Sequence, residues 1–143
     1  MNLRKWGLLL LPAACLSLTG CGLPGASSDR VIYANYDDGD GFCAQIKDAF
    51  AAKAKADGIE VEFLDAKSDG NMQIDQLNEA ISRGAGAIIL LAADGSSIVK
   101  TIEKANDAGI PIITVNRSVA GGKVLRAYSD DVEAGRMQGE YMA

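Results

Sequence analysis

The 143-residue sequence contains no histidine and only three cysteines. Without histidine, Ser-His-Asp catalysis, Cys-His catalysis and most zinc sites are excluded from this segment. The sequence also shows no nucleophile–base pair, metal-ligand cluster or Gly-rich dinucleotide loop. We therefore expect a protein that is not an enzyme, with no catalytic residue, no metal and no cofactor.

The three cysteines do not predict a disulfide framework. Cys15 lies in an apolar leader, and Cys21 belongs to a motif described below. Cys43 is then left alone, and a single cysteine indicates no internal pairing. We expect Cys43 to be a small apolar residue in the first turn of a helix.

Basic residues are sparse and unclustered. The chain has 14 Lys and Arg against 19 Asp and Glu, a net charge of −5. Because Arg4 and Lys5 lie in the first twenty residues, the remainder has 12 basic and 19 acidic residues and a charge of about −7. Binding to nucleic-acid phosphates requires concentrated Lys and Arg, so we expect no nucleic-acid partner. A hydrophobic content of 48% fits a globular domain with a real core.

The first twenty residues predict an export signal. A short positive start, Met1–Trp6, precedes the apolar run Gly7–Leu18, which Pro12 interrupts. This run is too short to span a membrane as a mature helix. We interpret residues 1–20 as a signal peptide.

The next residues resemble a bacterial lipobox. Leu18-Thr19-Gly20-Cys21 places small residues before a cysteine whose thiol can accept an acyl chain. The resemblance implies that Cys21 is lipidated, becomes the new N-terminus and attaches the protein to a membrane. An ordinary secretory signal with a chance cysteine is the alternative. Residues 21–30 are small, polar and without periodicity, which predicts a flexible tether.

From residue 31 onward, apolar runs typical of strands alternate with amphipathic stretches typical of helices. Three times the order is helix, glycine, apolar strand, at Gly58, Gly84 and Gly109. The run 87–93 is almost wholly apolar, as in strands buried on both faces of a parallel sheet. We therefore predict one α/β domain at residues 31–143, a doubly wound parallel sheet with helices on both faces. The predicted strands are 31–36, 59–64, 87–93, 110–115 and 124–128, and the predicted helices follow from Phe42, Asp69, Asp94 or Ser96, and Glu133.

In such sheets, ligands bind at the carboxyl ends of the strands. Three motifs lie there. Residues 109–117 form an apolar strand after Ile-Pro that ends in Asn116-Arg117, and Tyr128-Ser129-Asp130-Asp131 is followed by Gly135. The third is the loop Gly39–Phe42.

Together these motifs resemble the type I periplasmic sugar-binding proteins, in the branch of the ribose-binding protein. The resemblance covers residues 31–143. It implies the flavodoxin-like strand order 2-1-3-4-5 and a protein of two lobes that close on the ligand by a hinge. On this resemblance residues 31–143 are an N-terminal lobe, and we expect the second lobe to be missing from the segment.

The resemblance also implies a function. The protein would be an extracytoplasmic lipoprotein, in the periplasm or at the cell surface, that captures a monosaccharide or polyol for an ABC importer. Its partners would be the sugar or polyol, the permease subunits and, through Cys21, the membrane. The residues that the resemblance assigns to ligand binding are Asp40, Phe42, Asn116, Arg117 and Asp131. The family usually has Asn where this sequence has Asp131, and often has Asn-Pro where it has Asp40-Gly41.

The chemistry of these residue types agrees with that assignment. Arg117 offers a planar set of donors that can bridge neighbouring hydroxyl groups. Asp40 and Asn116 offer acceptors, and Phe42 can lie against the apolar face of a sugar ring. The alternatives are a salt-bridged surface arginine at 117, a core residue at 42 and a simple turn former at 116.

The acidic loop Tyr36–Gly41 does not match a calcium site. If Gly41 takes position six of an EF-hand loop, Tyr36 falls at position one and Lys47 at position twelve, and neither suits its ligand role. Three other functions remain as alternatives. They are a sensory binding protein that presents its ligand to a membrane receptor, the core of a lactose-repressor-like regulator, and an enzyme of flavodoxin-like fold. The regulator would need a helix-turn-helix where the chain has its lipobox.

Overall fold

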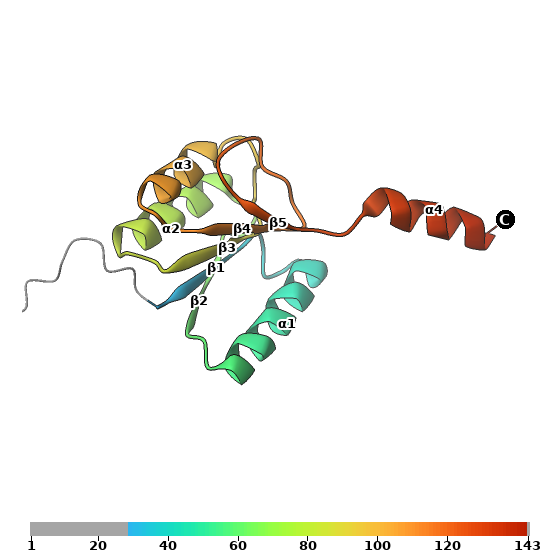
Figure 1. Cartoon of the computed structure of the whole chain (residues 1–143), viewed down its shortest axis with the longest axis horizontal. Coiled ribbons are helices and arrows are strands. Elements are labelled where there is room, and N and C mark those ends of the chain that lie inside the picture. The colour runs from blue at the N-terminus through green and yellow to red at the C-terminus, as the bar shows by residue number, and fades with distance from the viewer. Residues whose placement is uncertain (1–28, 143) are drawn as a thin grey trace, which may run out of the picture.

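The computed structural model describes residues 29–142 and contains five strands in one parallel sheet of order β2-β1-β3-β4-β5 (Figure 1). This confirms the predicted strand order and the predicted α/β class. The predictions for residues 1–28, including the signal peptide and lipidation of Cys21, lie outside the described residues. The elements are β1 (Val31–Asn35), α1 (Gly41–Asp57), β2 (Val61–Asp65), α2 (Gly70–Ser82), β3 (Ala87–Leu90), α3 (Val99–Asp107), β4 (Ile112–Val115), β5 (Leu125–Ala127) and α4 (Asp131–Met142).

Helices cover both faces of the sheet, as predicted. Successive residues of a strand point to opposite faces, so each central strand supplies two separate clusters of buried side chains. On one face, β1, β3 and β4 pack against α2 and α3, with Ile32, Ile88, Leu77 and Ile102 among the residues of this cluster. On the other face, Tyr33 and Ile89 pack with Cys43 of α1. Cys43 is a free, buried thiol, in agreement with the expected apolar role.

The start of α3 differs from the prediction. Neither Asp94 nor Ser96 is the N-cap; the helix begins at Val99, and its N-cap position, Ile98, makes no side-chain capping bond. Instead, the carboxylate of Asp94 accepts hydrogen bonds from the main-chain N–H of Ser96 and of Ser97, at 2.9 and 2.6 Å. Asp94 therefore stabilises the turn before the helix rather than the helix itself.

Strand β5 and helix α4 contribute nothing to the core. Every described residue from Leu125 to Met142 is exposed, and α4 projects away from the sheet in Figure 1. The helix begins at Asp131, two residues before the predicted start, and Asp130 accepts a hydrogen bond from the Glu133 N–H at 2.9 Å. Within residues 29–142, no helix combines the length and the apolar character that crossing a membrane requires.

Candidate functional site

The residues predicted to bind a ligand follow β1, β4 and β5. Because the strands are parallel, their carboxyl-terminal ends lie at the same end of the sheet. Asn116 and Phe42 line one shallow hollow at this end. Asn116, Arg117 and Asp131 line a second cavity beside it. Asp40 lies near enough to Arg117 for the positive charge of the guanidinium to lower the pKa of its carboxyl group. The fold thus brings all five residues to one end of the sheet.

Arg117 reaches from the end of β4 across the end of β3 to the end of β1. Its Nη1 donates hydrogen bonds to the carbonyl oxygens of Ala92 and Ala93, at 3.0 and 3.4 Å. Its guanidinium carbon lies 4.0 Å from the centroid of the Tyr36 ring. Within the described part of the chain, its partners are main-chain oxygens and an aromatic face rather than a carboxylate. Arg117 is exposed, as the alternative interpretation expects, but among residues 29–142 it forms no salt bridge.

The turn at Asn116 directs Arg117 toward the neighbouring strands. Asn116 has a φ of 59°, in the left-handed region that Asn tolerates better than most residues. Its N–H donates to the Ala127 carbonyl oxygen at 2.9 Å, and the Arg117 N–H donates to the Val115 carbonyl oxygen at 2.6 Å. Asn116 is thus a turn former and also a residue of the cavity.

Gln73 of α2 fixes the main chain on which Arg117 rests. The side chain is fully buried. Its Nε2 donates to the carbonyl oxygens of Leu91 and Asn35, at 2.9 and 3.3 Å, and its Oε1 accepts from the Ala93 N–H at 2.8 Å. The Leu91 carbonyl and the Ala93 N–H thus bond to a side chain rather than to a neighbouring strand, and β3 ends at Leu90 although the apolar run continues to Ala93.

Asp40 caps α1. Its carboxylate accepts a hydrogen bond from the Cys43 N–H at 2.8 Å. The hydrogen bonds from Cys43, and to a smaller extent the charge of Arg117, hold the pKa of Asp40 below its ordinary value. Asp40 is therefore ionised and partly engaged by the helix.

Phe42 lies in the first turn of α1 and is 55% exposed. It is not the core residue of the alternative interpretation. Together with Ile46 and Tyr128 it lines the hollow that Asn116 borders. Its ring is thus available to an apolar surface of a ligand.

The cavity beside Arg117 has a volume of about 320 Å³. Asp131, at the start of α4, contributes a carboxylate that also accepts a hydrogen bond from the Ser129 hydroxyl at 2.9 Å. The cavity is mostly polar, and it adds a residue that the sequence did not single out, Arg126 of β5. The lining residues are Thr114, Asn116, Arg117, Ser118, Arg126, Tyr128 and Asp131.

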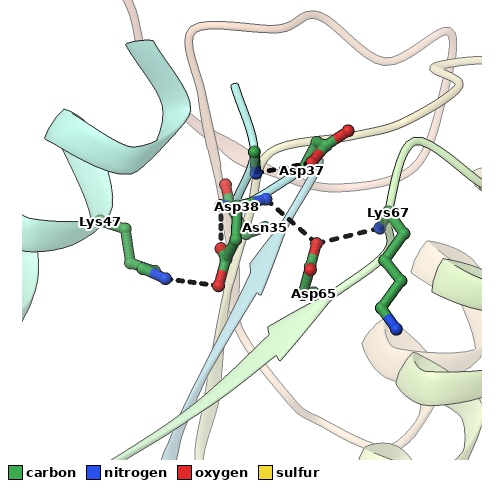
Figure 2. Close-up of polar contacts among 7 residues, drawn as sticks. Asn35, Asp37, Asp38, Lys47, Asp65 and Lys67 are labelled. Carbon is green, nitrogen blue, oxygen red and sulfur yellow. Dashed lines mark hydrogen bonds and ion pairs between the residues drawn. The ribbon is translucent and has the colours of Figure 1, made fainter. Parts of the chain in front are cut away.

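A polar network joins the loops that follow β1 and β2 (Figure 2). Asp38 accepts from Asn35 Nδ2 at 2.6 Å and forms an ion pair with Lys47, and its N–H donates to Asp65 Oδ1 at 3.1 Å. Burial alone would raise the pKa of Asp38, but the hydrogen bonds from Lys47 and Asn35 outweigh it and lower that pKa. The Lys67 N–H also donates to Asp65 Oδ1, at 2.9 Å. These contacts tie the acidic loop to α1 and to the end of β2.

Within residues 29–142, no group of three or more His, Cys, Asp or Glu side chains is arranged to hold a metal ion.

Sequence reasoning missed Tyr36 and Gln73. Gln73 carried a signal, since it is a polar residue at helical spacing from the buried Leu77 and Ile81. The only sequence feature of Tyr36 that could have indicated a role is its position directly after β1.

Comparison with known proteins matches residues 31–143 to the model of the family described as "Periplasmic binding protein domain". The chain is 32% identical to the ribose import binding protein of Bacillus subtilis over 103 residues, which cover 71% of this chain and 34% of that protein. It is 30% identical to a xylitol-binding protein of Mycolicibacterium smegmatis over 135 residues, which cover 92% of this chain and 39% of that protein.

A solved structure described as a periplasmic ribose ABC transporter from Conexibacter woesei superposes with a TM-score of 0.75 at 25% sequence identity. The superposition covers 85% of this chain and 41% of that one. The chain therefore spans less than half the length of each of these three proteins.

Proposed function

Because this chain belongs to the periplasmic binding protein domain family, we propose that the protein captures a small neutral sugar or polyol for an ABC importer. The main observation that supports this proposal is the position of Arg117 and Asn116, which line a polar cavity at the carboxyl-terminal ends of the strands. Ligands of open α/β sheets bind at these ends. The names of the relatives, which mention ribose and xylitol, support a polyhydroxylated ligand.

The charges around the site favour a neutral ligand over a sugar acid or phosphate. Arg117 and Arg126 bring two positive charges, and Asp131 at the cavity and Asp40 beside Arg117 bring two negative ones. Guanidinium groups donate hydrogen bonds and carboxylates accept them, and a hydroxyl group can do either. A ligand with many hydroxyl groups can satisfy both kinds of side chain without adding charge.

The residues have distinct roles in this proposal. The N–H groups of Arg117 donate to ligand oxygens, Asn116 and Asp131 complete the polar wall, and Asp40 accepts through its second oxygen. Phe42 offers a face to the apolar side of the ligand. The relatives are named as binding and import proteins, and we propose that this protein also binds its ligand without transforming it.

Two further parts of the proposal concern regions that lie wholly or mostly outside the described residues. We propose that residues 1–20 are a signal peptide and that Cys21 carries lipid, which would anchor the protein to a membrane, in the periplasm or at the cell surface, by a tether at residues 21–30. We also propose that the site is completed by a second lobe that closes over the ligand, since the relatives are more than twice as long as the matched region.

A thermal-shift screen of the intact protein tests the function. A ligand that binds only the folded state raises the melting temperature in proportion to the logarithm of its concentration. D-ribose, xylitol and myo-inositol are the first probes, and D-ribose 5-phosphate is the charged control. We expect at least one neutral probe to stabilise the wild type and to have a smaller effect on Arg117→Ala. Stabilisation only by the phosphate would contradict the proposed ligand class.

A further inference from the structure

Contacts within the chain hold the guanidinium of Arg117 in one orientation. Nη1 is engaged by the carbonyl oxygens of Ala92 and Ala93, and one face lies over the Tyr36 ring at 4.0 Å. Arginine has five N–H donors. Among residues 29–142, the N–H groups on Nε and Nη2 have no hydrogen-bond partner, so this edge of the guanidinium is the one that a ligand can reach.

Tyr36 is itself fixed in place. Its half-buried ring packs against the core cluster under α1. Its carbonyl oxygen accepts a hydrogen bond from the Ser68 N–H at 3.0 Å, which ties it to the loop after β2. Tyr36 follows β1 directly and Arg117 follows β4, with β3 between the two strands. The ring therefore gives a rigid surface beneath a long and otherwise flexible side chain.

We propose that Tyr36 is a positioning residue for ligand binding: its aromatic face holds the Arg117 guanidinium in the binding orientation before the ligand arrives. The inference rests on the proposed function, because it assigns to Tyr36 a role in that same site. A cation over the face of an aromatic ring is attracted by the ring's negative charge distribution. An arginine that is already oriented loses less conformational entropy on binding, which raises affinity.

The proposal requires a ring and not merely a side chain of similar size. Tyr36→Phe keeps the aromatic face, whereas Tyr36→Leu fills much of the same space without it. This role does not depend on the Tyr36 hydroxyl, because the contact with Arg117 is made by the ring. Comparing these two variants therefore separates positioning by the ring from simple packing.

A first experiment needs no ligand. In intact protein labelled with ¹⁵N-arginine, the Nε–H resonance of Arg117 is assigned by its disappearance in Arg117→Lys. The ring current of Tyr36 should shift this resonance upfield. We expect the shift to persist in Tyr36→Phe and to vanish in Tyr36→Leu. Phe63→Leu, which removes another partly exposed ring on β2, is the matched control and should leave the resonance in place.

A second experiment measures affinity, with D-ribose and xylitol as probes in titration calorimetry. We expect Tyr36→Leu to weaken binding by roughly three- to thirty-fold, the range of cation–π contributions from exposed to desolvated sites. Tyr36→Phe should stay within about threefold of the wild type. In the Arg117→Ala background, Tyr36→Leu should cause no further loss, because the group it positions is gone.

The outcomes separate this inference from the proposed function. An unchanged Arg117 resonance in Tyr36→Leu would overturn the positioning role, whichever sugar binds. An equal loss of affinity in both backgrounds would also overturn it, because the ring would then contact the ligand directly. If the wild type binds neither probe nor any neutral compound of the screen while the resonance behaves as expected, the proposed function fails and the positioning of Arg117 stands.

Discussion

The hydroxyl of Ser68 donates a hydrogen bond to the carboxylate of Asp37 at 2.5 Å, across 31 positions of sequence. Ser68 has a φ of 63°, and Lys67 before it has a φ of 49°. Two consecutive non-glycine residues in the left-handed region are uncommon and persist where the surroundings hold them. The loop after β2 therefore supports the loop after β1, which carries Asp40 and leads into Phe42.

The first prediction concerns this contact. Ser68→Ala removes the hydroxyl but keeps the backbone, and we expect the free energy of unfolding to fall by about 1 kcal/mol. Ligand affinity should also decrease, because the loop that holds Asp40 loses a support. Ser96→Ala is the control, since Ser96 is exposed and its contact to Asp94 uses the main-chain N–H. Urea denaturation measures the effect, and equal stability of the two variants would show that the Ser68 contact has no net value.

The second prediction concerns Arg117. Its loss leaves ligand oxygens without a charged donor, so Arg117→Ala should weaken sugar binding by roughly ten- to a hundred-and-fifty-fold. Arg117→Lys should also lose affinity, because one ammonium group cannot reproduce the planar set of donors. Titration calorimetry on the intact protein measures both. Wild-type affinity in a folded Arg117→Ala variant would remove Arg117 from the site.

The third prediction concerns Gln73. Gln73→Leu keeps the volume but leaves the Leu91 carbonyl and the Ala93 N–H, both near the core, without their partner. We expect the free energy of unfolding to fall by about 2–4 kcal/mol. Gln45→Leu, at an exposed position of α1, should change it by less than about 0.5 kcal/mol. A small effect at Gln73 would mean that water replaces the side chain at the end of β3.

The fourth prediction concerns Tyr33. Its hydroxyl is buried without a hydrogen-bond partner among the described residues, so Tyr33→Phe should leave stability at pH 7 unchanged or raise it by about 1 kcal/mol. Burial raises the pKa of Tyr33 to about 12, with a smaller contribution from the negative charges of Cys43 and Asp38. The unfolded chain ionises near the ordinary value of 10.

The sign of the pH dependence follows from these two values. Between them the unfolded state releases the proton that the folded state keeps, so the stability present below pH 10 is lost as the pH rises toward 12. Tyr33→Phe should lack this loss. Denaturation measured at several alkaline pH values compares the two proteins, and parallel curves would show that Tyr33 is not responsible.

The fifth prediction concerns the N-terminal segment. Mass spectrometry of membrane-extracted protein should find an acylated Cys21 as the first residue. Cys21→Ser should abolish the modification and release the protein from the membrane, while Cys15→Ser, within the apolar leader, should not. A soluble mature protein cut at another residue would show that the segment is an ordinary secretory signal.

The sequence predicted the helices and strands well because their signals are local, whereas the strand order came from the resemblance to the family. The apolar strand at 87–93 and the glycines after three helices are visible without any tertiary knowledge, and Gly58 does end α1 in a left-handed conformation. The start of α3 was predicted wrongly because Asp94 bonds to N–H groups of a turn that precedes the helix. A capping residue before a turn and one before a helix look the same in sequence.

The candidate site was only partly visible from the sequence. Asn116 and Arg117 stood out because they end an apolar strand in a motif of the family. The predicted strand order already placed β3 between β1 and β4, but the stacking of Arg117 on Tyr36 could not be predicted, because it depends on the left-handed turn at Asn116 and on the carbonyl oxygen of Ala92 that the side chain reaches. Gln73 acts through three backbone groups, one at the end of β1 and two just after β3, and no local pattern identifies such partners.

The contacts of Arg117 join the ends of β1, β3 and β4, which lie far apart in the chain and meet only when the sheet is assembled. A sugar held by this guanidinium would therefore depend on the sheet as a unit rather than on one loop. In native-state hydrogen exchange, amides that exchange only through global opening are slowed by any ligand specific for the folded state. The binding of a small molecule at the carboxyl-terminal ends of the strands should therefore slow the exchange of the most protected amides in the middle of the sheet, far from any atom that the molecule touches.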